Sequence, residues 1–170
     1  MKFTLEQYYN WLTSLKTGRQ AYQVRIFMQD LSLKDFLNIS RKFQYYCGKD
    51  GVSWLCVYSS TDSENARPVF IKTGKPGRPK KKVEGEKVPA HMHCIILGTS
   101  DKSPRQTGLK LTKSINKYGH KKGFLTKKSQ LRPLADGDHF FNGVAYDLTQ
   151  SDNYRSGGDF DFKAYHETHR

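Results

Sequence analysis

The chain has 170 residues, the usual length of one domain, so we expect a single domain over residues 1–170. Apolar residues make up 36% of the chain and aromatic residues 13%, which excludes an intrinsically disordered composition, and no apolar run approaches the roughly 18 residues of a membrane-spanning helix. The 29 lysines and arginines outnumber the 16 aspartates and glutamates, so the formal net charge is +13, a balance that favours a polyanionic partner.

Caps and apolar periodicity predict the first elements of the chain. Thr4 with Gln7 has the pattern of a capping box, and apolar residues at helical spacing follow it. Ser32 begins a second such pattern, which Gly48 should stop because glycine commonly ends a helix. Segments rich in β-forming residues follow each helix. The predicted elements are a helix over 4–17, a strand over 21–28, a helix from 33 that stops at 48, and a strand over 52–58.

Residues 60–88 form a polar segment in which lysine, proline and glycine cluster, and we interpret it as a long basic loop. Its segment 75–82 resembles an AT-hook, a short extended stretch whose arginine enters the minor groove of A·T-rich duplex DNA. The alternative, which we favour, is a loop that contacts phosphates without selecting sequence. The residues expected to contact DNA are Lys75, Arg78, Lys80, Lys81 and Lys82.

The segment 89–97, with the sequence PAHMHCIIL, is the clearest predicted strand. Residues i and i+2 of a strand point to the same face, so His91 and His93 would present two imidazoles side by side, with Met92 and Cys94 on the opposite face. Two neighbouring imidazoles form half of a divalent metal site. The alternative is a pair of ordinary surface histidines, and the pair alone does not decide between the two.

The last predicted helix carries a tyrosine away from its apolar stripe. At about 100° per residue, Tyr146 and Gln150 lie one turn apart on the side opposite the apolar residues. A phenol displayed in this way could act as a nucleophile, and the alternative is an exposed structural tyrosine. The predicted elements in this half of the chain are a basic helix over 104–118, a strand or extended segment over 123–134, a helix over 138–151 and a polar, aromatic tail over 154–170. Gly119 and Gly123 disfavour a stable helix around Tyr118.

Positive charge is concentrated in one part of the chain. Residues 72–132 contain 17 basic and three acidic residues, and the remainder contains 12 basic and 13 acidic residues. A segment of one sign points to nucleic acid, bound largely through its phosphates, and the alternative is an inert basic surface. The lysines expected to form a track for DNA are Lys110, Lys113, Lys117, Lys121 and Lys122.

Three cysteines, Cys47, Cys56 and Cys94, are odd in number and widely spaced. They form neither a disulfide framework nor a zinc site of the Cys-x-x-Cys kind. We therefore expect reduced thiols and a cytoplasmic protein.

An early strand, a His-hydrophobic-His strand and a helix bearing Tyr-x-x-x-Gln follow one another in a basic setting. This order resembles the HUH endonuclease superfamily, which includes rolling-circle replication initiators of plasmids and viruses, conjugative relaxases and single-strand transposases. The resemblance spans roughly residues 21–163. It implies an α+β fold, similar to a ferredoxin-like or RNA-recognition-motif domain, with the histidine strand central in an antiparallel sheet flanked by helices.

The resemblance also implies an enzyme. His91 and His93 would bind Mg²⁺ or Mn²⁺, and Tyr146 would attack the scissile phosphate of single-stranded DNA, leaving a 5′-phosphotyrosine and a free 3′-hydroxyl. The expected function is a sequence- or structure-specific nickase that initiates rolling-circle replication of a plasmid or phage in the cytoplasm of a bacterial host cell. The expected partners are an origin or hairpin in single-stranded DNA, duplex DNA through the basic loop, and a host helicase and polymerase, with no membrane.

The third metal ligand, the nucleophile and the function each have alternatives. The Tyr-x-x-x-Gln spacing is similar to that of the single-strand transposases, in which the glutamine completes the metal site, so Gln150 is the expected third ligand, with Asp62 and Glu64 as backups. Tyr118, followed by Lys121 in a Tyr-x-x-Lys spacing, is the alternative nucleophile. The alternative functions are a transposase or relaxase of the same superfamily, or a non-catalytic nucleic-acid-binding module.

Overall fold

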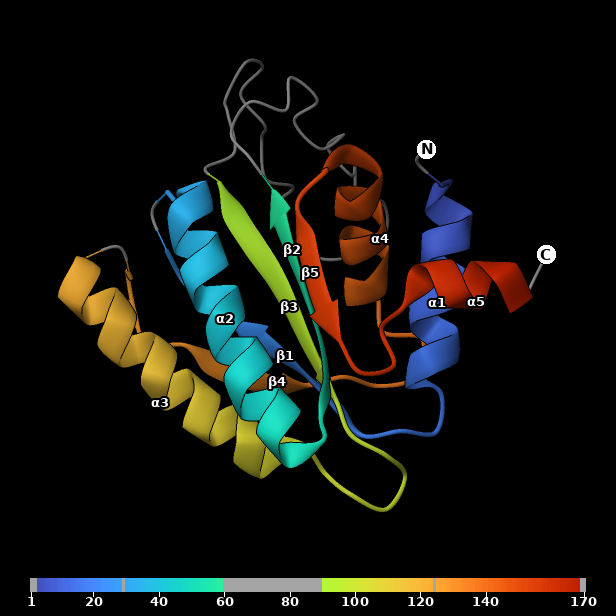
Figure 1. Cartoon of the computed structure of the whole chain (residues 1–170), viewed down its shortest axis with the longest axis horizontal. Helices are drawn as coiled ribbons and strands as arrows, with labels where there is room; N and C mark the ends of the chain where they lie inside the picture. Colours follow the sequence, from blue (N-terminus) through green and yellow to red (C-terminus); the bar gives the residue numbers. More distant parts are fainter. Residues whose placement is uncertain (1–2, 29, 60–89, 124, 169–170) are drawn as a thin grey trace, which may run out of the picture.

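The computed structural model describes residues 3–28, 30–59, 90–123 and 125–168. These residues form helices interspersed with strands of an antiparallel sheet, which confirms the predicted α+β class (Figure 1). In chain order the elements are α1 (Leu5–Lys16), β1 (Ala21–Arg25), α2 (Leu33–Asp50), β2 (Ser53–Ser59), β3 (His91–Leu97), α3 (Arg105–Lys122), β4 (Gln130–Pro133), α4 (Phe140–Gln150), β5 (Tyr154–Gly157) and α5 (Phe162–Thr168). None of the helices in these ranges combines the length and the apolar character that crossing a membrane requires.

The strands of the described chain form one antiparallel sheet in the order β4-β1-β3-β2-β5. β3, the histidine strand, lies in the centre and pairs with β1 on one side and β2 on the other. From β1 to β4, the strand order and the intervening helices α2 and α3 are those of a βαββαβ, ferredoxin-like arrangement. The predicted sheet and the central position of the histidine strand are therefore confirmed.

A layer of helices covers each face of the sheet (Figure 1). α2 and α3 cover one face, where Phe43 and Leu111 belong to one buried core. α1, α4 and α5 cover the other face, where Trp11 and Phe141 belong to a second core. Each layer buries the apolar stripe of its helices against the sheet, which is the main stabilising contribution to the fold.

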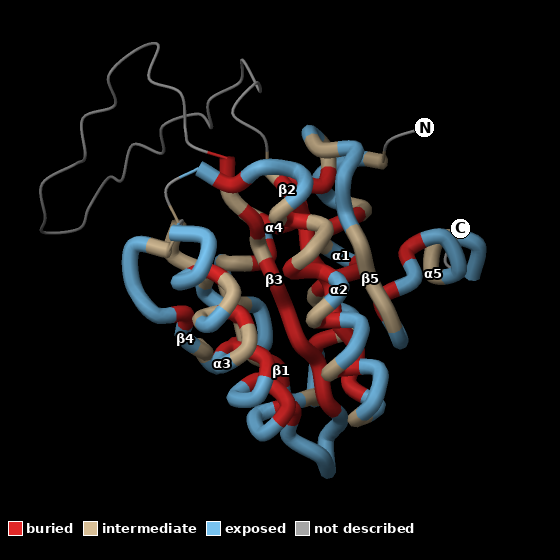
Figure 2. The backbone as a smooth tube through the Cα atoms, turned by 60° about the vertical axis from the view of Figure 1, so that its left-hand side comes forward, coloured by how far each residue is buried: buried red, intermediate tan, exposed pale blue. Residues whose placement is uncertain are grey.

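β3 contributes to both cores because neighbouring strand residues point to opposite faces. Met92, Cys94 and Ile96 pack under α2 and α3, as the alternation predicted. Ile95 and Leu97 pack under α1 and α4, on the same face as the two histidines. Figure 2 shows this strand as a buried segment through the middle of the molecule.

Local sequence signals explain where α1 and α2 begin. Thr4 Oγ1 accepts a hydrogen bond from Gln7 N at 3.1 Å, and Gln7 Oε1 accepts one from Thr4 N at 2.8 Å, which confirms the capping box. The prediction that α2 stops at Gly48 is wrong, because the helix continues to Asp50. Gly51 ends it with φ 67°, a left-handed conformation that glycine adopts without steric cost.

α3 is longer than the sequence predicted. It continues through Gly119 to Lys122, and Gly123 ends it. A Cβ atom on Gly119 would collide with the side chain of Leu125, so the glycine allows the segment after the helix to pack directly against it. This contact depends on the tertiary fold, and helical periodicity therefore gave no sign of it.

The tail contains two elements that the sequence analysis did not assign. β5 pairs with β2 and forms one edge of the sheet, opposite the β4 edge. α5 follows, and Phe160 and Phe162 pack edge-on against Trp11 at ring-centroid distances of 5.8 and 5.1 Å. These aromatic contacts attach the tail to the face of the sheet that carries the histidines.

Candidate metal centre

β3 brings the two predicted histidines together on one face of the sheet. His91 and His93 lie opposite Ser59 and Val57 of β2, and their ring centroids are 4.9 Å apart. Their side chains are 23% and 16% exposed, so both are partly covered and still reachable from solvent. The strand therefore holds two imidazoles side by side on a rigid element.

Asp147 of α4 joins the two histidines in a compact cluster. Its side chain is 3% exposed, and its Oδ2 lies 2.6 Å from His93 Nε2 and 4.0 Å from His91 Nε2. One candidate ligand atom from each of the three residues lies within 4.8 Å of the others. We refer to His91, His93 and Asp147 as the His-His-Asp cluster.

The sequence analysis missed Asp147, although a signal for it was present. At about 100° per residue, Asp147 falls beside Phe140 at the border of the apolar stripe of α4. An acid in that position is turned toward the sheet, where its carboxylate needs a charged or hydrogen-bonding partner. The predicted site residues of this helix, Tyr146 and Gln150, lie away from the apolar stripe, about 100° and 60° around the helix from Asp147.

The chemistry of the His-His-Asp cluster suits a divalent metal ion. Imidazole nitrogens bind many divalent ions, and a carboxylate oxygen adds the negative charge and hard donor that Mg²⁺ and Mn²⁺ prefer. A carboxylate buried as deeply as Asp147 requires a charged or hydrogen-bonding partner, and the imidazole of His93 lies at hydrogen-bond distance from it. The cluster therefore fits an ion bound by two nitrogens and one oxygen of the protein, with further positions left for a substrate.

Contacts from β4 fix the start of α4 beside His93. Arg132 donates hydrogen bonds to both carboxylate oxygens of Asp138 at 3.0 and 3.1 Å, and Asp138 accepts another from Phe140 N at 2.9 Å. The Phe140 ring packs edge-on against His93 with centroids 5.5 Å apart. Burial pushes the pKa of Asp138 upward, but the hydrogen bonds from Arg132 and Phe140 outweigh burial, so this pKa lies below its usual range.

Tyr146, the predicted nucleophile, immediately precedes Asp147 on α4 and is half-buried. Successive helical residues are about 100° apart, so Tyr146 is turned by that angle around α4 from Asp147, the residue that meets the histidines. α4 therefore carries the candidate nucleophile and a candidate metal ligand at adjacent positions.

Gln150, the predicted third ligand, is exposed at the end of α4. Its Nε2 donates a hydrogen bond to Thr149 Oγ1 at 3.3 Å. Asp147 is the acid that the structure brings to the histidines, and a ligand role for Gln150 stays a prediction. The two backups, Asp62 and Glu64, lie outside the described residues.

The alternative nucleophile, Tyr118, lies on the other face of the sheet. It packs against the core under α2 and α3, its hydroxyl donates to Asp35 Oδ1 at 2.6 Å, and that hydroxyl accepts from Asn38 Nδ2 at 3.0 Å. Burial and the hydrogen bond to Asp35 raise the pKa of Tyr118, which makes the reactive phenolate harder to form. Tyr146 is therefore the better candidate for chemistry at the His-His-Asp cluster.

The predicted DNA-binding residues fall into two groups. One group lies on α3, is exposed throughout, and comprises Lys110, Lys113, Lys117, Lys121 and Lys122. With Lys42 and Tyr46 of α2, the first four line a hollow of about 660 Å³, which we call the α2–α3 groove. The other group, Lys75, Arg78, Lys80, Lys81 and Lys82, lies outside the described residues.

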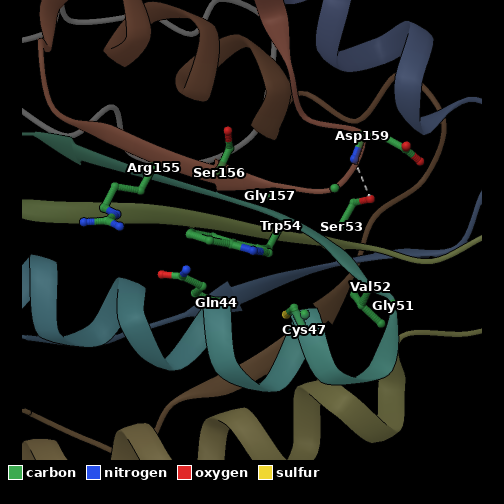
Figure 3. Close-up of a pocket in the computed structure, with 12 residues that line it drawn as sticks. Gln44, Cys47, Gly51, Val52, Ser53, Trp54, Arg155, Ser156, Gly157 and Asp159 are labelled. Carbon is green, nitrogen blue, oxygen red and sulfur yellow. Dashed lines mark hydrogen bonds between the residues drawn. The ribbon is translucent and has the colours of Figure 1, made fainter.

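A second hollow, of about 490 Å³, lies between α2 and β5 (Figure 3). Trp54 lies between these two elements, and Ser53 Oγ accepts a hydrogen bond from the backbone nitrogen of Asp159 at 2.9 Å. Burial raises the pKa of the Cys47 thiol in its wall to about 12, so this thiol is not a nucleophile at neutral pH. This hollow contains none of the site residues predicted from the sequence.

Comparisons of the chain with protein-family models, with curated proteins and with solved structures find no match. No family is therefore assigned to the chain. Inference about its function depends on the His-His-Asp cluster, on Tyr146 and on the distribution of charge.

Proposed function

We propose that this protein is a metal-dependent endonuclease and strand transferase for single-stranded DNA that acts through a covalent 5′-phosphotyrosine on Tyr146. The observation that carries the proposal is the His-His-Asp cluster, whose acid adjoins Tyr146 on α4. The order of the histidine strand and the tyrosine helix resembles the HUH endonucleases, and the net charge of +13 suits a DNA substrate.

The proposed reaction is an attack of the Tyr146 phenol oxygen on the scissile phosphorus. A bond forms between these two atoms, and the 3′-oxygen leaves with the electron pair of the broken bond. The products are a 5′-phosphotyrosine and a free 3′-hydroxyl, so the reverse attack of that hydroxyl reseals the strand and releases the tyrosine. A neutral phenol is a weak nucleophile, so its proton passes to solvent as the bond forms, and the leaving 3′-oxygen takes up a proton to become the hydroxyl.

His91, His93 and Asp147 are the residues that would hold the divalent ion. When bound, Mg²⁺ or Mn²⁺ would supply Lewis-acid polarisation of the phosphate oxygens. The chain itself contributes the rigid placement of the donors, since two come from the central strand and the third from a helix packed against the same face. Such placement lowers the barrier because the groups need no rearrangement at the moment of reaction.

The biological role that we propose is the initiation of rolling-circle replication of a plasmid or phage, because the free 3′-hydroxyl can prime a polymerase. The partners would be an origin or hairpin in single-stranded DNA and a host helicase and polymerase. A single-strand transposase is the second candidate. The observation in its favour is that the acid of the cluster comes from the tyrosine helix, the helix that supplies the third ligand in transposases.

The test is a search for a covalent protein–DNA adduct. The protein is incubated with a labelled single-stranded oligonucleotide library and Mn²⁺ and resolved under denaturing conditions. We expect an adduct that is lost with Tyr146→Phe, with EDTA and with the double variant His91→Ala/His93→Ala. Tyr45→Phe is the matched control, because it removes the same hydroxyl from an α2 residue that is 62% exposed.

Two results would contradict parts of the proposal. An adduct that survives Tyr146→Phe and disappears with Tyr118→Phe would move the nucleophile to α3. DNA binding that needs no metal and gives no adduct with any oligonucleotide would instead support a non-catalytic binding module.

A further inference from the structure

We propose that the α2–α3 groove binds the phosphate backbone of double-stranded DNA. The groove lies on the face of the sheet opposite the His-His-Asp cluster. The inference goes beyond the proposed nicking reaction, because it assigns a separate surface and a different form of DNA.

The lysines of α3 form one row along the groove. Lys110, Lys113, Lys117 and Lys121 are three or four residues apart, so they share one side of the helix. At a rise of 1.5 Å per residue the row extends over about 16 Å. A row of ammonium groups on a straight, rigid helix suits a regular line of phosphates, and duplex DNA presents such a line along a stiff rod.

This row keeps most of its positive charge. Lys110 Nζ lies 3.7 Å from a carboxylate oxygen of Asp50, whereas no carboxylate in the described ranges pairs with the three lysines that follow. Lys42 adds a further ammonium group from the α2 wall, where it donates a hydrogen bond to Ser114 Oγ at 3.0 Å. Asp35, the acid beside Tyr118, already accepts hydrogen bonds from Tyr118 and Ser32. In the described part of the chain every charged residue that lines the groove is a lysine, which favours a polyanion.

Aromatic side chains in the groove are already engaged within the protein. Lys42 Nζ lies 5.3 Å from the Tyr118 ring centroid, and the Tyr118 hydroxyl is bonded to Asp35 and Asn38. Tyr46 is half-buried with its ring edge-on to Tyr45, centroids 5.0 Å apart. Surfaces for single strands combine basic groups with aromatic faces on which unpaired bases stack. The groove offers ammonium groups instead, which favours a duplex whose bases are already paired and stacked.

The sheet separates this groove from the candidate metal centre. α2 and α3 cover one face, and α4 covers the other (Figure 1). A duplex in the groove and a single strand at the His-His-Asp cluster would therefore contact opposite faces of the protein. The groove could hold the duplex next to a cutting site, and the duplex would not compete with the single strand for the His-His-Asp cluster.

The test measures binding of a short blunt DNA duplex of arbitrary sequence by fluorescence anisotropy at several salt concentrations. Lys113→Gln/Lys117→Gln should weaken binding and reduce the slope of log affinity against log salt by about 1.8, because each phosphate contact contributes about 0.9. Lys113→Arg/Lys117→Arg should retain the affinity. The matched control is Lys49→Gln/Lys163→Gln, which removes the same charge from two exposed lysines outside the groove and should leave the slope unchanged.

Three outcomes would overturn the proposal: no change in duplex affinity, an equal loss in the two glutamine double variants, or a loss confined to a single-stranded oligonucleotide. The last result would assign the groove to single-stranded DNA. Adduct formation separates this proposal from the nicking proposal. Tyr146→Phe should lose the adduct and keep full duplex binding.

Discussion

Asp147 converts a pair of histidines into a set of three donors. Its carboxylate is almost completely buried and lies at hydrogen-bond distance from His93. An isolated buried carboxylate costs several kcal/mol, so the chain can hold this charge inside only because partners face it from β3. The geometry of the cluster therefore depends on two elements that are far apart in the sequence.

Replacing Asp147 tests the proposed metal site directly. Asp147→Asn should weaken Mn²⁺ binding by about tenfold or more, because the amide keeps the shape of the side chain and loses the negative charge. Isothermal titration calorimetry with Mn²⁺ measures the change. Asp101→Asn, at an exposed acid after β3, should bind Mn²⁺ like the wild type. Equal Mn²⁺ affinity in Asp147→Asn and the wild type would remove Asp147 from the ligand set.

At the residue scale, the sequence predicted the positions that depend on local geometry. The shared face of His91 and His93 follows from strand alternation, and the placement of Tyr146 on α4 away from the apolar stripe follows from helical periodicity. Asp147 was not predicted, because a buried acid is understandable only when its partner on another strand is known. Periodicity places a side chain on a face, but it does not say what covers that face.

At the scale of elements, the junction between β4 and α4 holds the tyrosine helix in place. Arg132 of β4 and the first amide of α4 both bond to Asp138, and Phe140 then packs against His93. A shift of this junction would move Asp147 and Tyr146 together relative to the histidines. The contribution of this junction to the free energy of unfolding can be measured as a function of pH.

Asp138→Asn should lower the free energy of unfolding at neutral pH by roughly 1–3 kcal/mol, because hydrogen bonds to a charged group are lost or weakened. The pKa of Asp138 is depressed in the folded state, so the stabilisation is complete above the unfolded value of about 3.9 and is lost as pH falls through the folded pKa. Chemical denaturation of both proteins between neutral and acidic pH should show the difference shrinking below about pH 4. Glu167→Gln, at an exposed acid of α5, is the control, and a difference independent of pH would contradict the assignment.

Elements with local signals were predicted, and elements fixed by tertiary contacts were not. The capping box placed the start of α1 correctly. Gly48 was interpreted as a helix end and Gly119 as disfavouring a stable helix, although both lie inside helices, because the effect of a glycine depends on its φ angle and on what packs against it. β5 has only four residues, and its pairing with β2 makes it a strand.

For the molecule as a whole, the buried thiols report whether the core under α2 and α3 remains closed. Cys47, Cys56 and Cys94 are all buried in this core. Burial raises the pKa of Cys47 to about 12 and also raises the pKa of Cys56. We expect no reaction with an aromatic disulfide reagent in the native state at neutral pH, and reaction of all three thiols after denaturation. Fast native-state reaction of any of these thiols would show that the core under α2 and α3 opens.

The two edge strands limit how the molecule can associate with other chains. β4 and β5 have four residues each, and the long strands β2 and β3 lie inside the sheet. Intermolecular strand addition, the first step toward amyloid-like assembly, uses the unpaired amides and carbonyls along a sheet border. Borders this short present few such groups, so the fold carries a built-in protection against self-templated aggregation.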